Sequence, residues 1–168
     1  MDRYDSDPLS LPAALDGRRR FGRADLEFHD VDHSGLSYEG RVFVEPHPAA
    51  EDRRPVDEST AFDDGRYAGS FYVFGHWGCV GDEGHCEVPS GPLHAFDHRP
   101  PHKLTPIKLS VEITGALERL VEDPDVGEFT VHVIPHPAPL TPDDDTSDLL
   151  RFGRLSLLTY DGEGDPAA

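Results

Sequence analysis

The sequence predicts an all-β fold, an antiparallel β-sandwich of the jelly-roll type with one short α-helix. Its clearest strand covers residues 107–113, where four apolar side chains alternate with three polar ones. A period of two is typical of a strand with one buried face. Other short segments rich in aromatic and β-branched residues are separated by proline- and glycine-containing stretches. Helices do not alternate with these strands as they do in a parallel sheet, so antiparallel pairing is favoured.

Five further segments are predicted as strands, and they cover residues 24–32, 36–45, 67–75, 128–135 and 149–160. The first two are expected to pair as a hairpin through a His-Ser-Gly turn at 33–35. In the fourth segment, Phe129 and two valines share one face, which predicts that His132 points to solvent from the other face. Gly153 is expected to mark a bulge or a bend in the last segment.

One helix is predicted at about residues 115–122. The hydroxyl of Thr114 suits an N-cap, and Pro124 suits a position just beyond the last turn. An apolar stripe that can pack on the sandwich is formed by Ala116, Leu117, Leu120 and Val121.

The chain is expected to divide into an N-terminal arm at 1–22, one sandwich domain at 23–161 and a disordered tail at 162–168. The arm is charged, is interrupted by proline and holds the only basic run, at 18–20. It is either solvated or docks on the acidic surface of a partner. Residues 46–65 are rich in proline and acidic side chains, and this composition predicts an exposed loop.

The formal net charge of −18 excludes whole classes of partner. Nucleic acids and anionic membrane surfaces are both recognised through basic patches, so neither is expected to bind. No stretch approaches the ~20 apolar residues of a membrane-spanning helix. The first residues are polar and acidic rather than those of a signal peptide, so we expect a protein that is cytoplasmic or exported together with a partner.

The candidate functional stretch runs from Tyr67 to His102 and contains both cysteines, the single tryptophan and five of the ten histidines. Cys79 and Cys86 allow three interpretations. They could form a small disulfide loop, which requires an oxidising compartment. They could bind zinc or copper together with His76 and His85, since thiolates and imidazoles suit both ions. They could also be free, buried thiols.

Three more histidines follow at a spacing of four residues, and these are His94, His98 and His102. A pair of copper ions requires histidines on rigid helices, and the adjacent Pro100 and Pro101 exclude a helix there. We therefore interpret the three as polar loop residues. No group of side chains is spaced for acid–base or nucleophilic chemistry, so the chain is not expected to be an enzyme on its own.

Three segments resemble the C-terminal β domain that follows the dicopper domain in bacterial tyrosinase-family proteins, and more distantly that of plant polyphenol oxidases. The segments are LEFHDVDHSGLSYEGRVFV at 26–44, YAGSFYVFGHWGCVGDEGHCEVP at 67–89 and RPPHKLTPIKLSVEI at 99–113. The order of the Ala-Gly-Ser-Phe strand, the short helix and the last two strands is also similar. The loop between Cys79 and Cys86 is the most specific part, and it matches the bacterial form.

In that family the dicopper domain oxidises phenols to quinones, and the β domain covers the entrance to the copper site. The resemblance implies a non-catalytic accessory domain or subunit that docks on a tyrosinase-like dicopper partner, shields its copper site or assists copper loading. The helical copper-binding half is absent from these 168 residues. The partner-facing residues are then expected to be His76, Trp77, His94, His98 and His102. The alternative is a free-standing zinc- or copper-binding module that uses His76, Cys79, His85 and Cys86.

Overall fold

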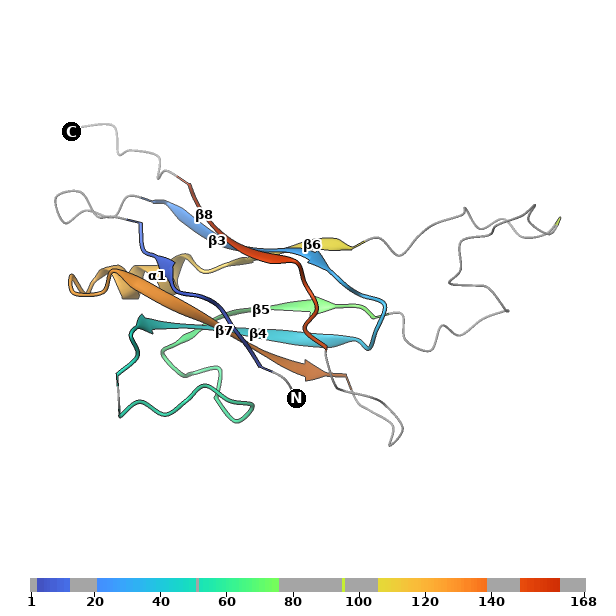
Figure 1. Cartoon of the computed structure of the whole chain (residues 1–168), viewed down its shortest axis with the longest axis horizontal. Coiled ribbons are helices and arrows are strands. Elements are labelled where there is room, and N and C mark those ends of the chain that lie inside the picture. The colour runs from blue at the N-terminus through green and yellow to red at the C-terminus, as the bar shows by residue number, and fades with distance from the viewer. Residues whose placement is uncertain are drawn as a thin grey trace.

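A computed structural model describes residues 3–12, 21–50, 52–75, 95, 106–138 and 149–160. Within these ranges the chain forms two antiparallel sheets packed face to face with one short helix, which confirms the predicted sandwich (Figure 1). In chain order the elements are β1 Tyr4–Asp5, β2 Leu9–Ser10, β3 Arg23–Val31, β4 Tyr38–His47, β5 Tyr67–Val73, β6 Ile107–Glu112, α1 Thr114–Val121, β7 Glu128–Pro137 and β8 Arg154–Tyr160.

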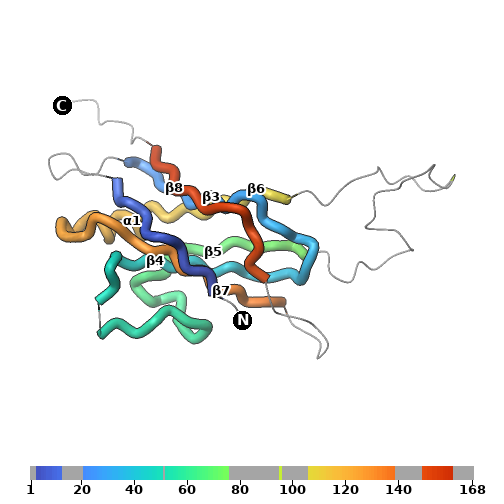
Figure 2. Tube along the Cα trace, in the orientation of Figure 1, coloured from blue at the N-terminus to red at the C-terminus, as the bar shows by residue number. Residues whose placement is uncertain are grey.

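The larger sheet has the strand order β1-β7-β4-β5, and β2 also pairs with β7. The smaller sheet has the order β6-β3-β8. Figure 2 shows the small sheet as one layer and the large sheet as the other, with α1 at one end of the sandwich. No helix among the described residues is long and apolar enough to cross a membrane.

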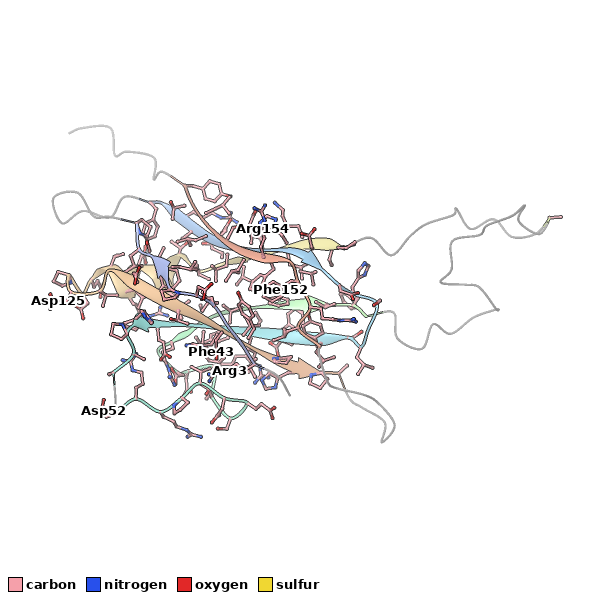
Figure 3. All side chains as sticks on the ribbon, viewed as in Figure 1. Arg3, Phe43, Asp52, Asp125, Phe152 and Arg154 are labelled. Atoms are coloured by element: carbon pink, nitrogen blue, oxygen red, sulfur yellow. The ribbon has the colours of Figure 1, made fainter. Side chains whose placement is uncertain are left out.

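The core lies between the two sheets and is built from the apolar faces of their strands. Phe28 of β3 is fully buried, and its ring centroid lies 4.6 Å from that of Phe71 on β5. Phe152, just before β8, lies between the sheets and packs edge-on against Phe28, with 5.3 Å between the ring centroids (Figure 3). Because a buried phenylalanine contributes roughly 1.5–3 kcal/mol relative to an exposed one, these rings are a main source of the adhesion between sheets.

The predicted hairpin of residues 24–32 and 36–45 is wrong. Both strands exist, as β3 and β4, but they belong to different sheets and face each other across the core. A bulge in β3 after Phe28 places Asp30 at φ 56°, in the left-handed region. An Asx turn follows, in which the Ser34 amide donates to Asp32 Oδ1 at 2.8 Å. Together these features redirect the chain, so a turn-forming sequence here joins two layers rather than two neighbouring strands.

Helix α1 closes one end of the sandwich. Its apolar stripe is buried as predicted, with Ala116, Leu117 and Leu120 packed in the core. The predicted N-cap is wrong, because Ile113 occupies that position and no side chain caps the helix. The Thr114 hydroxyl instead accepts a hydrogen bond from the Ala24 amide at 3.0 Å, so it ties the helix to β3.

The predicted solvated arm is wrong for the described residues 3–12. Tyr4 pairs with Val133 and Leu9 pairs with Phe129, so both short strands extend the large sheet along β7. Tyr4 also contacts Phe152 at a ring distance of 4.7 Å. The segment is therefore part of the sandwich, because its alternate apolar side chains complete the core. The basic run at 18–20 and the tail at 162–168 lie outside the described residues.

The predicted exposed loop at 46–65 is also partly wrong. Val56 is only 1% exposed and packs with Phe43 and Ile134 in a second, smaller core on the outer face of the large sheet. The loop thus covers the face of β4 and β7 that points away from the main core. This cover matters for the site described next, because it removes water from side chains that would otherwise be exposed.

Two glycines allow close packing. Gly40 pairs with Phe71 across β4 and β5, and a Cβ at Gly40 would lie 2.3 Å from the tip of that ring. The Phe71 ring therefore packs directly on the backbone of Gly40, where a larger residue would have a side chain. Gly153, which precedes β8, forms the predicted bend, and its amide donates to the His29 carbonyl at 2.8 Å.

Candidate functional site

All of the side chains singled out in the candidate loop lie outside the described residues, and these are His76, Trp77, Cys79, His85, Cys86, His94, His98 and His102. The strands that flank the loop are described. β5 ends at Val73 and β6 begins at Ile107, both at the end of the sandwich opposite α1 (Figure 1). The disulfide, the metal set and the partner-facing role therefore remain predictions.

The chain enters that loop through an exposed aromatic residue. Phe74 is 81% exposed although it directly follows the buried Val73. The next amide, that of Gly75, donates to Ser37 Oγ at 3.0 Å, which fixes the point where the loop leaves the sandwich. The root of the loop is thus a defined position that presents a large apolar side chain to solvent.

An ion network with a buried centre crosses the outer face of the large sheet. The His132 ring on β7 lies between two carboxylates, with Nδ1 2.6 Å from Asp5 Oδ1 and Nε2 2.8 Å from Glu45 Oε1. His132 and Glu45 are 7% and 8% exposed. Each ring nitrogen therefore has one carboxylate oxygen as its hydrogen-bond partner.

Arginines extend the network at both ends. Arg3 donates to Asp5 Oδ2 at 2.6 Å and to the Val56 carbonyl at 2.6 Å. At the other end, Arg66 donates to Glu45 Oε2 at 3.3 Å and holds Asp64 through two bonds of 2.9 Å. The chain of contacts joins β1, β7, β4 and the covering loop. Since every charged group has an opposite charge beside it, the burial of these groups is compensated.

Two carboxylates of this network, those of Asp5 and Asp64, have lowered pKa values. Burial alone would raise the pKa of Asp5, but the hydrogen bonds and charges of His132 and Arg3 outweigh burial and lower it. Hydrogen bonds from Arg66 lower the pKa of Asp64 to about 2, against the smaller opposing effect of burial. Both groups are therefore ionised in the folded chain at neutral pH.

The predicted solvent exposure of His132 is wrong. The N-terminal strand and the 52–66 loop cover the face of β7 that was expected to be open. Both ring nitrogens are engaged by carboxylate oxygens, at 2.6 and 2.8 Å, so neither faces an open space in which a metal ion or a substrate could lie. Among the described ranges, no three histidine, cysteine or acidic side chains are placed to hold a metal ion. The arrangement is therefore suited to holding strands together rather than to catalysis.

One sequence signal could have revealed this buried face. Ile134 lies two residues from His132, on the same outward side of β7, and an isoleucine there indicates a covered surface. The partners Asp5 and Glu45 could not be found in this way, because they come from distant parts of the chain.

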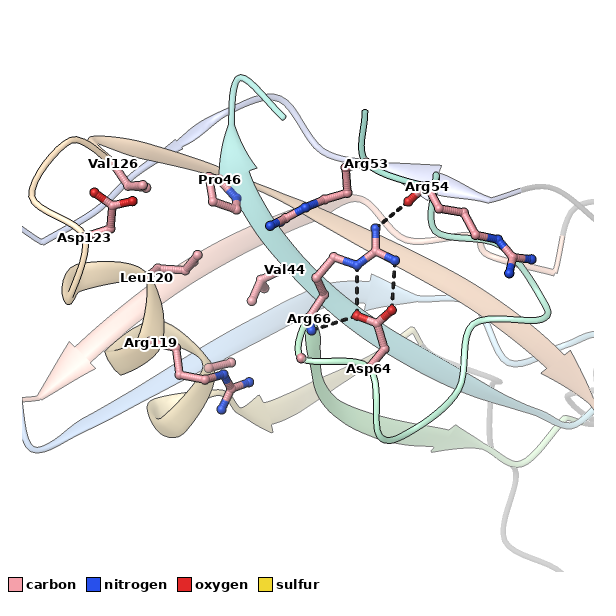
Figure 4. A pocket seen from close by; sticks show the side chains of 12 residues that line it. Val44, Pro46, Arg53, Arg54, Asp64, Arg66, Arg119, Leu120, Asp123 and Val126 are labelled. Carbon is pink, nitrogen blue, oxygen red and sulfur yellow. Dashed lines mark hydrogen bonds and ion pairs between the residues drawn. The ribbon is translucent and has the colours of Figure 1, made fainter. Parts of the chain in front are cut away.

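A second polar feature is a groove of about 560 Å³ beside α1 (Figure 4). Its floor is apolar and includes Val44, Leu120 and Val126. Four arginines and two aspartates line it, and these are Arg53, Arg54, Arg66, Arg119, Asp64 and Asp123. The groove lies at the opposite end of the sandwich from the root of the candidate loop (Figure 1).

No family model, no curated protein and no solved structure matches the chain.

Acid is expected to destabilise the fold through Asp64. Its folded pKa lies near 2, below the ordinary value of 3.8, so its stabilising contribution is present above about pH 4 and is lost as the pH falls towards 2. Urea unfolding between pH 6 and 2 should therefore show a smaller loss of stability for Asp64→Asn than for the wild type. The neighbouring, exposed Asp63→Asn is the matched control and should follow the wild-type curve. Equal acid sensitivity of Asp64→Asn and the wild type would contradict the assignment.

Replacing His132 should destabilise the fold strongly. His132→Ala leaves Glu45 buried without one of its donors, which is expected to lower the free energy of unfolding by about 2–3 kcal/mol. His47→Ala, at an exposed histidine on the same sheet, should change it by less than about 0.5 kcal/mol. Urea denaturation at pH 7 measures both variants. Similar losses in the two would show that His132 has no special role.

Proposed function

We propose that the chain is a non-catalytic accessory domain or subunit of a tyrosinase-like dicopper oxidase. It would dock over the entrance to the copper site, or assist copper loading, through the loop that begins after Phe74. The proposal rests first on the resemblance of three segments of the sequence, which include the stretch with Cys79 and Cys86. The partner would supply the phenol-oxidising chemistry.

The observation that carries the proposal is the order of the elements along the sandwich. The Ala-Gly-Ser-Phe segment lies in β5, an edge strand of the large sheet, and the candidate loop follows it. Strand β6, helix α1 and strands β7 and β8 then follow in the order that the resemblance implies. A loop that leaves and rejoins a sandwich at one end suits insertion into a partner's pocket.

The exposed aromatic residue at the root of the loop supports docking. Large apolar side chains that stay exposed on a folded domain often mark protein interfaces, and aromatic residues are enriched among those that dominate binding energy. Phe74 and the neighbouring Tyr72 are 81% and 63% exposed. Both belong to the segment that leads directly into the candidate loop.

A binding assay with a bacterial tyrosinase-like dicopper protein tests the proposal. The purified chain should co-elute with this partner in size-exclusion chromatography, and catechol oxidation should fall as the bound fraction rises. Phe74→Ser should weaken binding about tenfold, as expected for an interface aromatic. Phe62→Ser is the matched control, because Phe62 is 52% exposed but stacks on Arg41, on the outer face of the large sheet. It should leave binding unchanged.

Three results would count against the proposal. The first is the absence of co-elution both with and without copper. The second is equal weakening by the two phenylalanine variants. The third is catechol oxidation by the chain alone when it is loaded with copper. Zinc or copper that co-purifies with the chain and is lost in Cys79→Ser would instead favour the metal-binding module.

A further inference from the structure

We propose that the groove beside α1 binds a small organic anion, with its carboxylate held by Arg53 and Arg119 and its apolar body on the floor of the groove. The site is separate from the candidate loop and does not depend on the proposed function. It is formed by three parts of the chain: the end of β4, the 52–66 loop and the helix with the turn that follows it.

The charge of the groove is opposite to that of the molecule. The chain as a whole carries −18, whereas four arginines and two aspartates line this groove. One of the aspartates, Asp64, is neutralised by its two bonds to Arg66. The other, Asp123, accepts a hydrogen bond from the Asp125 amide at 3.0 Å. A local excess of positive charge on an acidic protein selects for an anionic ligand.

The four arginines differ in how many donors they have left. Arg66 donates to Asp64, to Glu45 and to the Arg54 carbonyl at 2.8 Å, so it mainly fixes the rim. The Arg54 side chain donates to Ser59 at 2.7 Å and points away from the groove (Figure 4). These two arginines are structural parts of the site rather than its anion contacts.

Arg53 and Arg119 have donors available. No hydrogen bond or ion pair joins the Arg53 guanidinium to a residue that the structure describes, although its charge adds a small part to the lowering of the Asp64 pKa. Figure 4 shows the side chain reaching over the groove between Pro46 and Arg66. Arg119 donates to the carbonyl oxygens of Gly115 at 3.0 Å and Tyr67 at 3.2 Å, which are neutral acceptors. A guanidinium has five N–H donors, so both groups can bind a carboxylate as well.

The floor favours an organic anion over an inorganic one. Leu120 and Ala116 of the helix and Val44 of β4 are core residues whose edges line the groove. Val126 and Pro46 add further apolar surface to the lining. The volume, about 560 Å³, falls in the usual range of small-molecule sites. An ion such as phosphate would satisfy the arginines but would leave this surface exposed to water.

Calorimetric titration of the full chain with benzoate, benzamide and inorganic phosphate tests the proposal. Benzoate should bind saturably at one site, while the neutral benzamide and phosphate should each bind at least about tenfold more weakly. Arg53→Gln and Arg119→Gln should each weaken benzoate binding about tenfold. Arg154→Gln, an exposed arginine on the small sheet, makes the same charge change far from the groove and should have no effect (Figure 3).

Several outcomes would overturn the proposal. If benzamide bound as tightly as benzoate, the arginines would not be recognising the charge of the ligand. If phosphate bound as tightly as benzoate, the apolar floor would not contribute to binding. Equal weakening of benzoate binding by Arg154→Gln and Arg53→Gln would indicate that benzoate is attracted by positive charge in general rather than bound at a defined site. Arg53 makes no side-chain hydrogen bond to the described residues, so Arg53→Gln is expected to stay folded and carries the test even if Arg119→Gln unfolds.

Discussion

The placement of the His132 ring between Asp5 and Glu45 is the interaction on which the rest of the large sheet depends. It joins the first described strand to the two central strands, β7 and β4, and Arg66 continues the link to the start of β5. A buried charged network is weak evidence for stability in itself, because removing charges from water costs free energy. Its contacts, however, are specific, because the ring of His132 bridges Asp5 of β1 and Glu45 of β4. We therefore regard it as the feature that fixes which segment covers β7.

Strand β7 is covered on both faces, and the loop that covers its outer face also contributes to the groove beside α1. The main core occupies one face, and the small cluster around Val56, with the ion network beside it, occupies the other. The 52–66 loop is held in place by these contacts, and the same loop provides Arg53 and Arg66 to the groove beside α1. The network and the groove thus share the 52–66 loop through Arg66, and the groove lies at the end of the sandwich opposite the root of the proposed docking loop (Figure 1).

The sequence allowed the strands and the helix to be predicted because their periodicity is local. The alternation at 107–113 and the apolar stripe of α1 depend only on neighbouring residues, and both predictions are confirmed. The pairing of β1 and β2 with β7 was missed because strands of two residues have no period to detect. His132 was wrongly predicted to face solvent for a related reason, since the cover over it comes from the N-terminal strand and the 52–66 loop, both far from it in the sequence. The groove combines arginines from separate segments, and no spacing in the sequence brings them together.

Hydrogen exchange at the amides of Ser6 and Leu11 tests the central claim most directly. These amides donate to the carbonyls of Val131 and Gly127, each at 2.9 Å, so they report whether the N-terminal segment stays on β7. In the wild type at pH 7 we expect both to exchange at least about a hundredfold more slowly than unstructured amides, and Asp5→Ala should remove the protection at Ser6 while the amides of β3 stay protected. Rapid exchange of Ser6 in the wild type, or unchanged protection in Asp5→Ala, would contradict the claim that the His132 network holds this strand in the sheet.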